Sequence, residues 1–258
     1  MNENLKVSFI QTELSWENPA INRKRFSDKI TSLPETDLIV LPEMFSTGFS
    51  MNSEKLAEKT QGETVVWMQK MAAKKNAAIT GSIIVCEGEK YFNRMFFVFP
   101  DGNFETYDKK HLFTFADEHE SYSPGNKKLI VEYLGWKICP LICYDLRFPV
   151  WSRNVENYDL LIYVANWPKA RTQAWDILLK ARAIENISYV VGVNRVGKDG
   201  NELEYSGHSA VYDMLGTRIS TSDFENEFSE TIVLSKPTLD TTRRKFAFLN
   251  DGDKFEIQ

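Results

Sequence analysis

Short runs of hydrophobic residues recur along the chain, and polar or turn-forming residues bound each of them. Runs of this length that end at turn-forming residues are typical of buried strands. The pattern therefore predicts β-strands at Lys6–Gln11, Leu38–Leu41, Ala78–Val85, Lys137–Ile142, Leu160–Ala165 and Tyr189–Val193.

Amphipathic stretches lie between many of these runs and predict helices. Residues Asn22–Leu33 follow the first run, and Glu63–Asn76 precede the third. The stretch Gln173–Asn186 repeats hydrophobic residues such as Ile177 and Ile184 on one side, with charged residues elsewhere. Alternating strands and helices indicate an α/β architecture.

Some neighbouring strands are expected to be antiparallel. The strand-like segments Asn93–Pro100 and Phe104–Lys109 flank an Asp-Gly-Asn turn, which is a signal for a β-hairpin. A second pair of this kind is His208–Met214 with Thr217–Ser220, and a further strand is expected at Glu230–Leu234. The helices therefore cover sheets that are not purely parallel.

The sequence predicts one domain. No Pro-, Gly- or Ser-rich linker, repeat or low-complexity segment divides residues 1–258. A C-terminal tail begins at about residue 236, where the basic segment Arg243–Lys245 precedes the hydrophobic segment Phe246–Leu249. The sequence leaves open whether this tail packs on its own domain or on a partner subunit.

The overall charge narrows the classes of partner. The 258 residues carry a net charge of -5, with a pI near 5.4, which argues against nucleic acid and anionic membranes. No hydrophobic stretch approaches the roughly 18 residues of a transmembrane helix. The first residues also lack the basic and then hydrophobic pattern of a signal peptide. We therefore expect a soluble cytoplasmic protein.

Three cysteines, Cys86, Cys139 and Cys143, are too few for a disulfide framework and suit a reducing compartment. Cys143 directly follows the strand predicted at Lys137–Ile142, so its sulfur could lie at the edge of a sheet, where active sites of α/β proteins gather. The backbone N–H of Tyr144 could then stabilise an oxyanion. The position of Cys143 in the sequence, taken alone, still favours the alternative that its side chain is buried in the core as a small hydrophobic group, as most free cysteines are.

Glu43 and the lysine pair Lys109 and Lys110 are further candidates. Glu43 follows the strand Leu38–Leu41 among hydrophobic neighbours, and desolvation there would raise its pKa towards that of a general base. One of the two lysines could support an anionic intermediate. The alternatives are that Glu43 is a solvated loop residue and that the two lysines belong to a charged turn on the surface.

No pattern indicates a metal or a nucleotide cofactor. The three histidines, His111, His119 and His208, are scattered, and no HExxH motif is present. The Gly-Lys-Asp-Gly segment at residues 197–200 is a turn and does not have the spacing of a phosphate-binding loop. The cofactor prediction is therefore none.

Taken together, the motifs resemble those of the nitrilase superfamily over nearly the whole chain. In order, they are LPEMF around Glu43, YDKKHLF around Lys109, ICYDLRFP around Cys143, and then VANWP, ARAIEN and VNRVG. The resemblance implies a Glu–Lys–Cys triad of Glu43, Lys109 and Cys143. Lys109 matches in preference to Lys110 because the family's lysine stands two residues before a His-Leu pair. A second glutamate of the family, on the loop ahead of a Pro-Gly pair, corresponds to Glu118, with Glu120 as the competitor that fits the spacing less well.

The same resemblance implies the family's fold, a four-layer αββα sandwich, and its usual assembly, a homodimer. Within the superfamily, MFSTGF, DKKHLF, ADEHESYSPG and ANWP look most like the ω-amidases. That branch hydrolyses the terminal amide of 2-oxoglutaramate and 2-oxosuccinamate through a cysteine thioester. The alternatives are an N-carbamoyl amino-acid amidohydrolase, an aliphatic amidase, a nitrilase, or a non-catalytic binding protein on this fold.

An ω-amidase must also bind the carboxylate of its substrate. Arg147, four residues after Cys143, could supply a two-pronged contact, although a structural salt bridge with Asp145 is as good an interpretation. Phe45 and Trp167 could wall a small pocket or belong to the core, and Asn166 of the VANWP motif is a further candidate for substrate binding. The next arginines to consider are Arg171 and Arg195.

Overall fold

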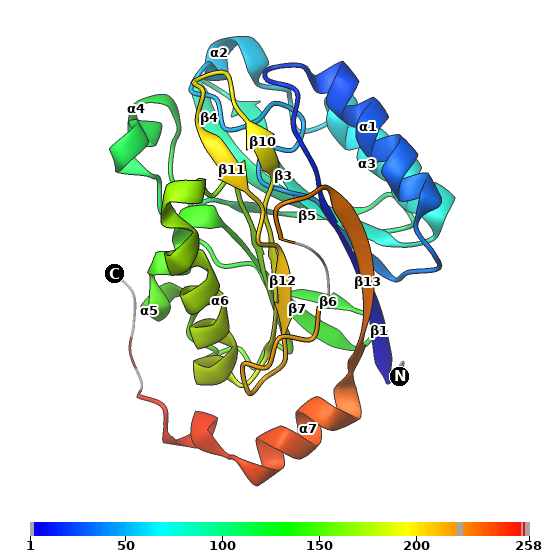
Figure 1. Ribbon diagram of the computed structural model, residues 1–258, viewed down its shortest axis with the longest axis vertical. Coiled ribbons are helices and arrows are strands. Elements are labelled where there is room, and N and C mark those ends of the chain that lie inside the picture. Colours follow the sequence, from blue (N-terminus) through cyan, green and yellow to red (C-terminus); the bar gives the residue numbers. More distant parts are fainter. Residues whose placement is uncertain (1–2, 221–223, 254, 256–258) are drawn as a thin grey trace.

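Two β-sheets form the centre of the protein in the computed structural model, which describes residues 3–220, 224–253 and 255 (Figure 1). The first sheet has the order β13 (Phe228–Ser235), β1 (Asn4–Gln11), β2 (Leu38–Val40), β3 (Ala78–Glu87), β4 (Lys90–Val98) and β5 (Phe104–Asp108). The second has the order β12 (Ala210–Tyr212), β9 (Tyr189–Val193), β8 (Leu160–Val164), β7 (Trp136–Ile142) and β6 (Val131–Tyr133). A separate ribbon pairs β10 (Val196–Lys198) with β11 (Glu204–Ser206).

Helices cover the outer face of each sheet. Helices α1 (Pro19–Ser32) and α3 (Glu63–Lys75) lie on the first sheet, and α5 (Pro149–Ser152) and α6 (Thr172–Asn186) lie on the second (Figure 1). Hydrophobic side chains of β1, β4, β7 and β8 meet between the sheets, while a second cluster fills the space under α1 and α3. The layers are helix, sheet, sheet and helix, which confirms the predicted α/β sandwich.

The remaining helices are short. They are α2 (Ser53–Leu56), α4 (Glu118–Ser121) and the 3-10 helices η1 (Thr114–Ala116), η2 (Cys143–Arg147), η3 (Lys169–Arg171) and η4 (Phe248–Asp251). All except η4, which lies in the C-terminal tail, are in the connections between strands, where most of the candidate site residues are found.

Local sequence explains where the long helices begin and end. Helix α1 starts earlier than predicted because the Asn18 side chain accepts a hydrogen bond from the Ile21 N–H and Pro19 suits the first turn. Helix α3 ends at Asn76, whose left-handed backbone (φ 51°) suits asparagine. The hairpin of β4 and β5 is confirmed, whereas the strand expected at Thr217–Ser220 is reduced to one bridge between Tyr212 and Arg218.

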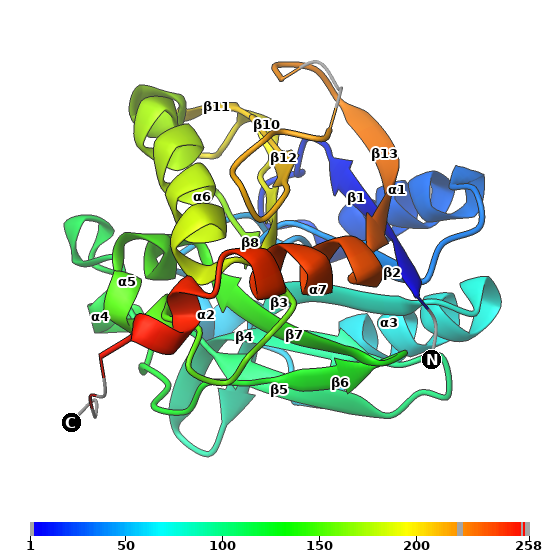
Figure 2. The ribbon, with the colours of Figure 1, turned by 90° about the horizontal axis from the view of Figure 1, so that it is seen from below.

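The C-terminal tail packs on its own domain. Helix α7 (Lys236–Lys245) closes the end of the sandwich opposite to α4 and the β10–β11 ribbon (Figures 1 and 2). Leu239 is buried in the core, and Asp159 pairs with both Lys236 and Arg243. The last residues, 254 and 256–258, lie outside the described part of the chain.

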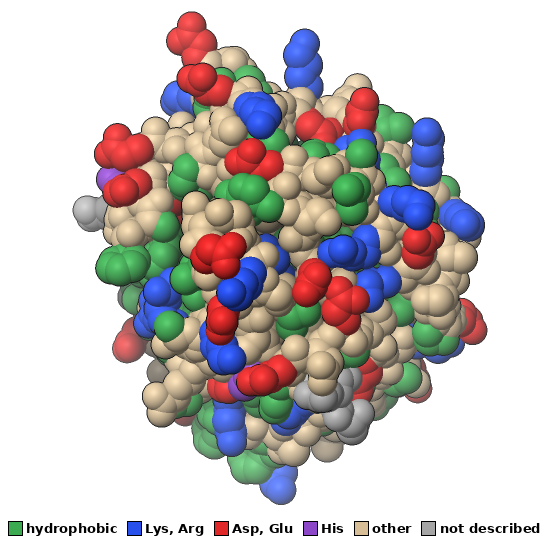
Figure 3. All heavy atoms as spheres, turned by 45° about the horizontal axis from the view of Figure 1, so that its top comes forward, with side chains coloured by type: hydrophobic (Ala, Val, Ile, Leu, Met, Phe, Trp, Pro, Cys, Tyr) green, Lys and Arg blue, Asp and Glu red, His purple; other side chains and the backbone are tan. Residues whose placement is uncertain are grey.

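The surface carries charges of both signs. On the face shown in Figure 3, acidic and basic side chains are interspersed, with hydrophobic side chains between them. Among the described residues, no helix is both long enough and hydrophobic enough to cross a membrane.

Candidate active site

Four predicted residues lie at the ends of strands or just beyond them, at one end of the sandwich. Glu43 follows β2 and Lys109 follows β5 in the first sheet, while Cys143 follows β7 in the second. Glu118 begins α4. Residues that leave neighbouring strands at the same edge converge, and here both sheets contribute to one site.

Lys109 joins the two glutamates in a buried cluster. Its Nζ donates to Glu43 Oε1 at 2.9 Å, and to Glu118 Oε1 and Oε2 at 3.0 and 2.9 Å. None of the three side chains is exposed to solvent. A buried charge without a partner costs several kcal/mol, so this pairing is a condition for burying the lysine at all.

Backbone groups fix the two carboxylates further. The Asn166 N–H donates to Glu43 Oε2 at 2.8 Å, and the Asn166 amide donates to the Glu43 carbonyl oxygen at 2.6 Å. The Phe113 N–H donates to Glu118 Oε2 at 2.6 Å. Asn166 therefore both lines the cavity and holds Glu43 in place. The second of these roles was not suggested by its position in the sequence.

The charges of the cluster set the protonation states around it. Burial by itself lowers the pKa of Lys109, but the charges of Glu118 and Glu43 outweigh it, so the pKa is raised and the ammonium stays charged. Burial, reinforced by Glu43, raises the pKa of the Cys143 thiol well above its ordinary value despite the opposing charge of Lys109. Burial also raises the pKa of Glu118. The resting cysteine is therefore a thiol that needs a base.

A strained turn presents Cys143. Its backbone is left-handed (φ 44°), which is uncommon for a residue with a side chain and tends to occur at functional sites. The buried Asp145 carboxylate supports the turn, accepting from the Ile142 N–H at 3.0 Å and from the Tyr107 hydroxyl at 2.7 Å. Its other oxygen accepts from the His111 N–H at 3.0 Å. Asp145 is thus occupied and forms no salt bridge with Arg147.

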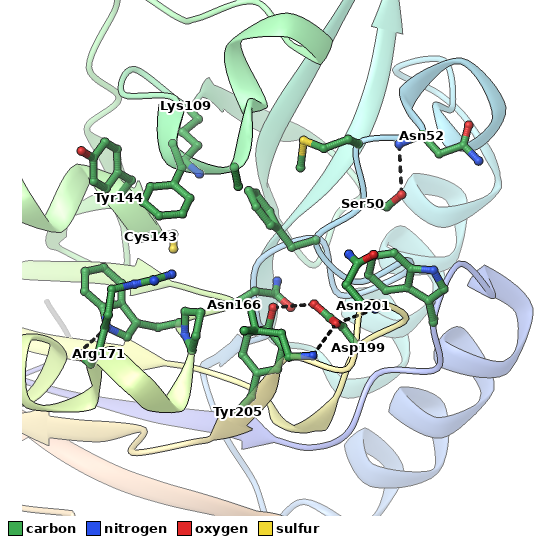
Figure 4. A pocket seen from close by; sticks show the side chains of 18 of the residues that line it. Ser50, Asn52, Lys109, Cys143, Tyr144, Asn166, Arg171, Asp199, Asn201 and Tyr205 are labelled. Carbon is green, nitrogen blue, oxygen red and sulfur yellow. Dashed lines mark hydrogen bonds between the residues drawn. The ribbon is translucent and has the colours of Figure 1, made fainter.

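Cys143 opens into a cavity of about 530 Å³. Lys109, Tyr144 and Asn166 line it together with the cysteine (Figure 4), and Trp167 is a further lining residue. A volume of this size accommodates a small organic molecule. No group of three or more His, Cys, Asp or Glu side chains in the described ranges is arranged to hold a metal ion.

Two arginines line the same cavity. The Arg147 guanidinium lies 5.0 Å from the centre of the Trp167 ring, and the Arg171 guanidinium lies 5.0 Å from that of Phe113. Figure 4 shows Arg171 extending into the cavity on the side of Cys143. Neither guanidinium forms an ion pair with any residue that the structure describes. Arg195 instead is fully buried, and its side chain donates to backbone carbonyls such as that of Lys198 at 2.8 Å.

The structure corrects the interpretation of Phe45 as a wall of the pocket. Phe45 is fully buried on the face of the first sheet that α1 and α3 cover. The centre of its ring lies 5.4 Å from that of Phe26, in an edge-to-face contact, and 5.7 Å from that of Trp67. It fills the space above Gly81, where a Cβ atom would come within 3.0 Å of its ring. Phe45 therefore belongs to the core, which was the alternative interpretation.

Several residues around the site had no signal in the sequence. Asn93 of β4 donates to Glu43 and to Glu118 from inside the sheet. Another part of the cavity wall comes from the loop with Trp16 and Glu17 and from the β10–β11 ribbon, with Asp199 in its turn and Tyr205 in β11. Residues of this kind are brought together only by the tertiary fold, so no local pattern could have found them.

Comparisons with known proteins agree with this geometry. The model of the carbon-nitrogen hydrolase family matches residues 12–244. The chain is 44% identical over 253 residues to the omega-amidase YafV of Escherichia coli (strain K12), covering 98% of each protein. It is 34% identical over 218 residues to the 2-oxoglutaramate amidase of Bacillus subtilis (strain 168), covering 81% of this chain and 83% of that protein.

A solved structure has nearly the same fold. It is XC1258 from Xanthomonas campestris, a CN-hydrolase superfamily protein with an arsenic adduct in its active site. The TM-score is 0.96 at 44% identity, and the match covers 99% of both chains.

Proposed function

The chain belongs to the carbon–nitrogen hydrolase family, and from this premise we propose that it removes the terminal amide of a small 2-oxo dicarboxylic acid monoamide, such as 2-oxoglutaramate or 2-oxosuccinamate. It is a hydrolase of carbon–nitrogen bonds other than peptide bonds. The observation that carries the proposal is the buried cluster of Glu43, Lys109 and Glu118 beside Cys143. The omega-amidase and 2-oxoglutaramate amidase relatives support the choice of substrate.

The first half of the reaction acylates Cys143. Glu43 takes the thiol proton, and the sulfur electron pair attacks the amide carbon while the carbonyl π electrons move to oxygen. The Lys109 ammonium and the Tyr144 N–H donate to this oxyanion. Glu43 then passes its proton to the amide nitrogen, the oxyanion electrons re-form the carbonyl, and the carbon–nitrogen bond breaks. Ammonia leaves, and a thioester remains on Cys143.

The second half releases the acid. A water molecule gives a proton to Glu43 as its oxygen attacks the thioester carbon, and the carbon–sulfur bond breaks when the oxyanion collapses. The sulfur recovers the proton from Glu43, which returns the enzyme to its starting state. Glu118 acts by holding Lys109 through two short contacts. These steps use neither a metal nor a nucleotide, so we expect activity to survive EDTA.

Selection of an acid requires a cation at the far end of the substrate, because a buried carboxylate without one costs several kcal/mol. The guanidinium groups of Arg147 and Arg171, which have no ion-pair partner within residues 3–220, 224–253 and 255, supply that cation in this proposal. The cation–π contacts with Trp167 and Phe113 hold both groups in place without neutralising them.

The test is ammonia release from a panel of substrates. We expect kcat/KM for 2-oxoglutaramate to exceed that for glutamine, propionamide, N-carbamoyl amino acids and nitriles by roughly tenfold or more. Equal rates on 2-oxoglutaramate and propionamide would exclude recognition of the carboxylate. A binding protein on this fold would release no ammonia from any of them, and its Cys143 would show no enhanced reactivity towards iodoacetamide.

We also propose that the protein is a homodimer that pairs through the outer face of α6. Ile177 and Ile184 are exposed there, one above the other, and the turn with exposed Leu215 packs against Ile184. A second copy would remove these side chains from water. Sedimentation should give a dimer for the wild type and a monomer for the Ile177→Glu, Ile184→Glu double variant. A wild type that sediments as a monomer at all concentrations contradicts the proposal.

A further inference from the structure

Asn93, in the middle of β4, contacts all three charged residues of the cluster. Its side-chain Nδ2 donates to Glu43 Oε1 at 2.8 Å and to Glu118 Oε1 at 3.3 Å. Its backbone carbonyl accepts from the Lys109 N–H at 3.0 Å. The residue is 1% exposed, and its Oδ1 has no hydrogen-bond partner among the described residues. Leaving a buried amide oxygen without a hydrogen bond is unfavourable. The two hydrogen bonds that Nδ2 donates must therefore offset this cost.

That advantage lies in the balance of charge. Two carboxylates share one ammonium in a space closed to solvent, and like charges at this distance favour protonation of one carboxylate. A protonated Glu43 could not accept the thiol proton. The Asn93 amide adds a hydrogen bond to each carboxylate and has no proton to lose, so it favours the form in which both are ionised.

The amide also determines which oxygen of Glu43 is free. Oε1 receives two donors, Lys109 Nζ and Asn93 Nδ2, which occupy both of its lone pairs. Apart from the Cys143 thiol, the Asn166 N–H is the donor to Oε2 among the described residues, so one lone pair of Oε2 remains for the thiol. We propose that Asn93 is a positioning residue that keeps Glu43 ionised beside Glu118 and leaves Oε2 as the atom that takes the Cys143 proton.

In this step the sulfur–hydrogen bond breaks, an oxygen–hydrogen bond forms at Oε2, and the negative charge moves from the carboxylate to the sulfur. The inference rests on the proposed function only in that Cys143 is the nucleophile and Glu43 its base. It does not depend on which amide the enzyme hydrolyses.

The pH dependence of thiolate formation reports this role. The titratable groups around Asn93 are Glu43, Lys109, Glu118 and Cys143, with Tyr122 next to the glutamates. Because hydrogen bonds to a carboxylate favour its ionised form, removing the Asn93 donor from both glutamates favours protonation within the cluster. The acid limb of the pH profile must then move to higher pH.

The experiment compares Asn93→Leu and Asn93→Asp with a matched control, Asn154→Leu. Asn154 is also a buried asparagine, and it donates to the Tyr158 and Asn186 carbonyls at 2.9 and 3.1 Å, away from the cluster. Two profiles are measured from low to high pH, namely kcat/KM for 2-oxoglutaramate and the rate at which iodoacetamide alkylates Cys143, located by peptide mass mapping.

We expect both Asn93 variants to move the acid limb up by about one pH unit and to lower kcat by roughly 30-fold or more, with KM within about threefold. Asn93→Asp, which adds a third carboxyl group, should give the larger shift. Asn154→Leu should reduce thermal stability and leave the acid limb in place.

An acid limb that stays at the wild-type pH in the Asn93 variants would show that Asn93 only supports the fold. Aspartate has the shape of asparagine, so Asn93→Asp decides the question if Asn93→Leu does not fold. The alkylation profile needs no amide substrate. A wrong substrate assignment would therefore abolish the first profile and leave the second intact, which separates the two failures.

Discussion

The charged cluster and the arginine wall of the cavity are built in opposite ways. Glu43, Lys109 and Glu118 are fully buried, the first two beyond the ends of strands and the third at the start of α4, and every charge among them has a partner. Arg147 and Arg171 lie on the short helices η2 and η3, stack on aromatic rings, and have no carboxylate partner in the part of the chain that the structure describes. The first group is organised before substrate binds, whereas the second, in the proposed function, receives the carboxylate of the substrate.

This difference separates chemistry from selectivity. Preorganised donors and charges contribute most when they act on the transition state, and their loss lowers kcat. A cation that waits for a ligand contributes to binding, and its loss raises KM. Variants in the two regions should therefore differ in the kind of defect as well as in its size.

The largest effect is expected for the nucleophile. Cys143→Ala should reduce kcat by roughly 10⁴-fold or more, because Cys143 is the only thiol among the described residues that line the cavity. Cys139→Ala, in the buried interior of β7, should change thermal stability and leave kcat unchanged. Ammonia release measures both, and activity within tenfold of wild type in Cys143→Ala would end the proposed mechanism.

The next effect distinguishes the two neighbouring lysines. Lys109→Ala leaves two buried carboxylates without their cation and removes a donor to the oxyanion, so kcat should fall by roughly 10²–10³-fold. The variant should also lose about 3–5 kcal/mol of stability. Lys110 lies instead over the Trp151 ring, 5.6 Å from its centre. Kinetics and thermal melting of Lys110→Ala should remain near wild type, and equal losses in kcat would mean that the two lysines act only through their charge.

A smaller and selective effect is expected at the arginine wall. Arg147→Lys keeps the charge but loses the planar fork, so KM for 2-oxoglutaramate should rise about tenfold, or about 1.4 kcal/mol. Arg171→Lys is the companion variant, because its guanidinium stacks in the same cavity. Propionamide, which lacks the carboxylate, serves as the control substrate. If both substrates suffer alike, the arginine supports the fold around Cys143.

The smallest effect on catalysis is expected at Phe45. Phe45→Leu removes part of a ring that packs between Phe26 and Trp67, so stability should fall by about 1–2 kcal/mol. KM for 2-oxoglutaramate should stay unchanged, because the side chain does not reach the cavity. A raised KM without loss of stability would contradict the assignment of Phe45 to the core and indicate that it contacts the substrate.

Much of the fold could be predicted because many of its strands are short hydrophobic runs. The strand Tyr189–Val193 has the predicted bounds, and most of the other predicted strands differ by a few residues at their ends, whereas Thr217–Ser220 forms only one bridge. Glu43, Lys109 and Cys143 could be found because each lies directly or shortly after a strand within a recognisable motif. For such residues, the local sequence indicates both where the residue lies in the sheet and which catalytic group it supplies.

The remainder of the site depends on tertiary contacts. Asn93 lies inside a strand, and only the pairing of β4 with β3 and β5 directs its amide towards two glutamates from other segments. The β10–β11 ribbon reaches the cavity because Gly200 packs closely against the Trp16 ring, where a Cβ atom would come within 2.3 Å. Phe45 was misplaced for the same reason, since the sequence does not show which side of the sheet a residue beyond its end will face.

The thioester on Cys143 is the central claim, and its direct test is rapid acid quenching of the enzyme mixed with 2-oxoglutaramate, followed by peptide mass analysis. The account predicts that ammonia released in the first turnover is accompanied by a 2-oxoglutaryl group on the peptide containing Cys143, and that Cys143→Ala gives neither product. First-turnover ammonia with the acyl group on another residue, or with the free acid formed before any acyl-enzyme, would contradict it.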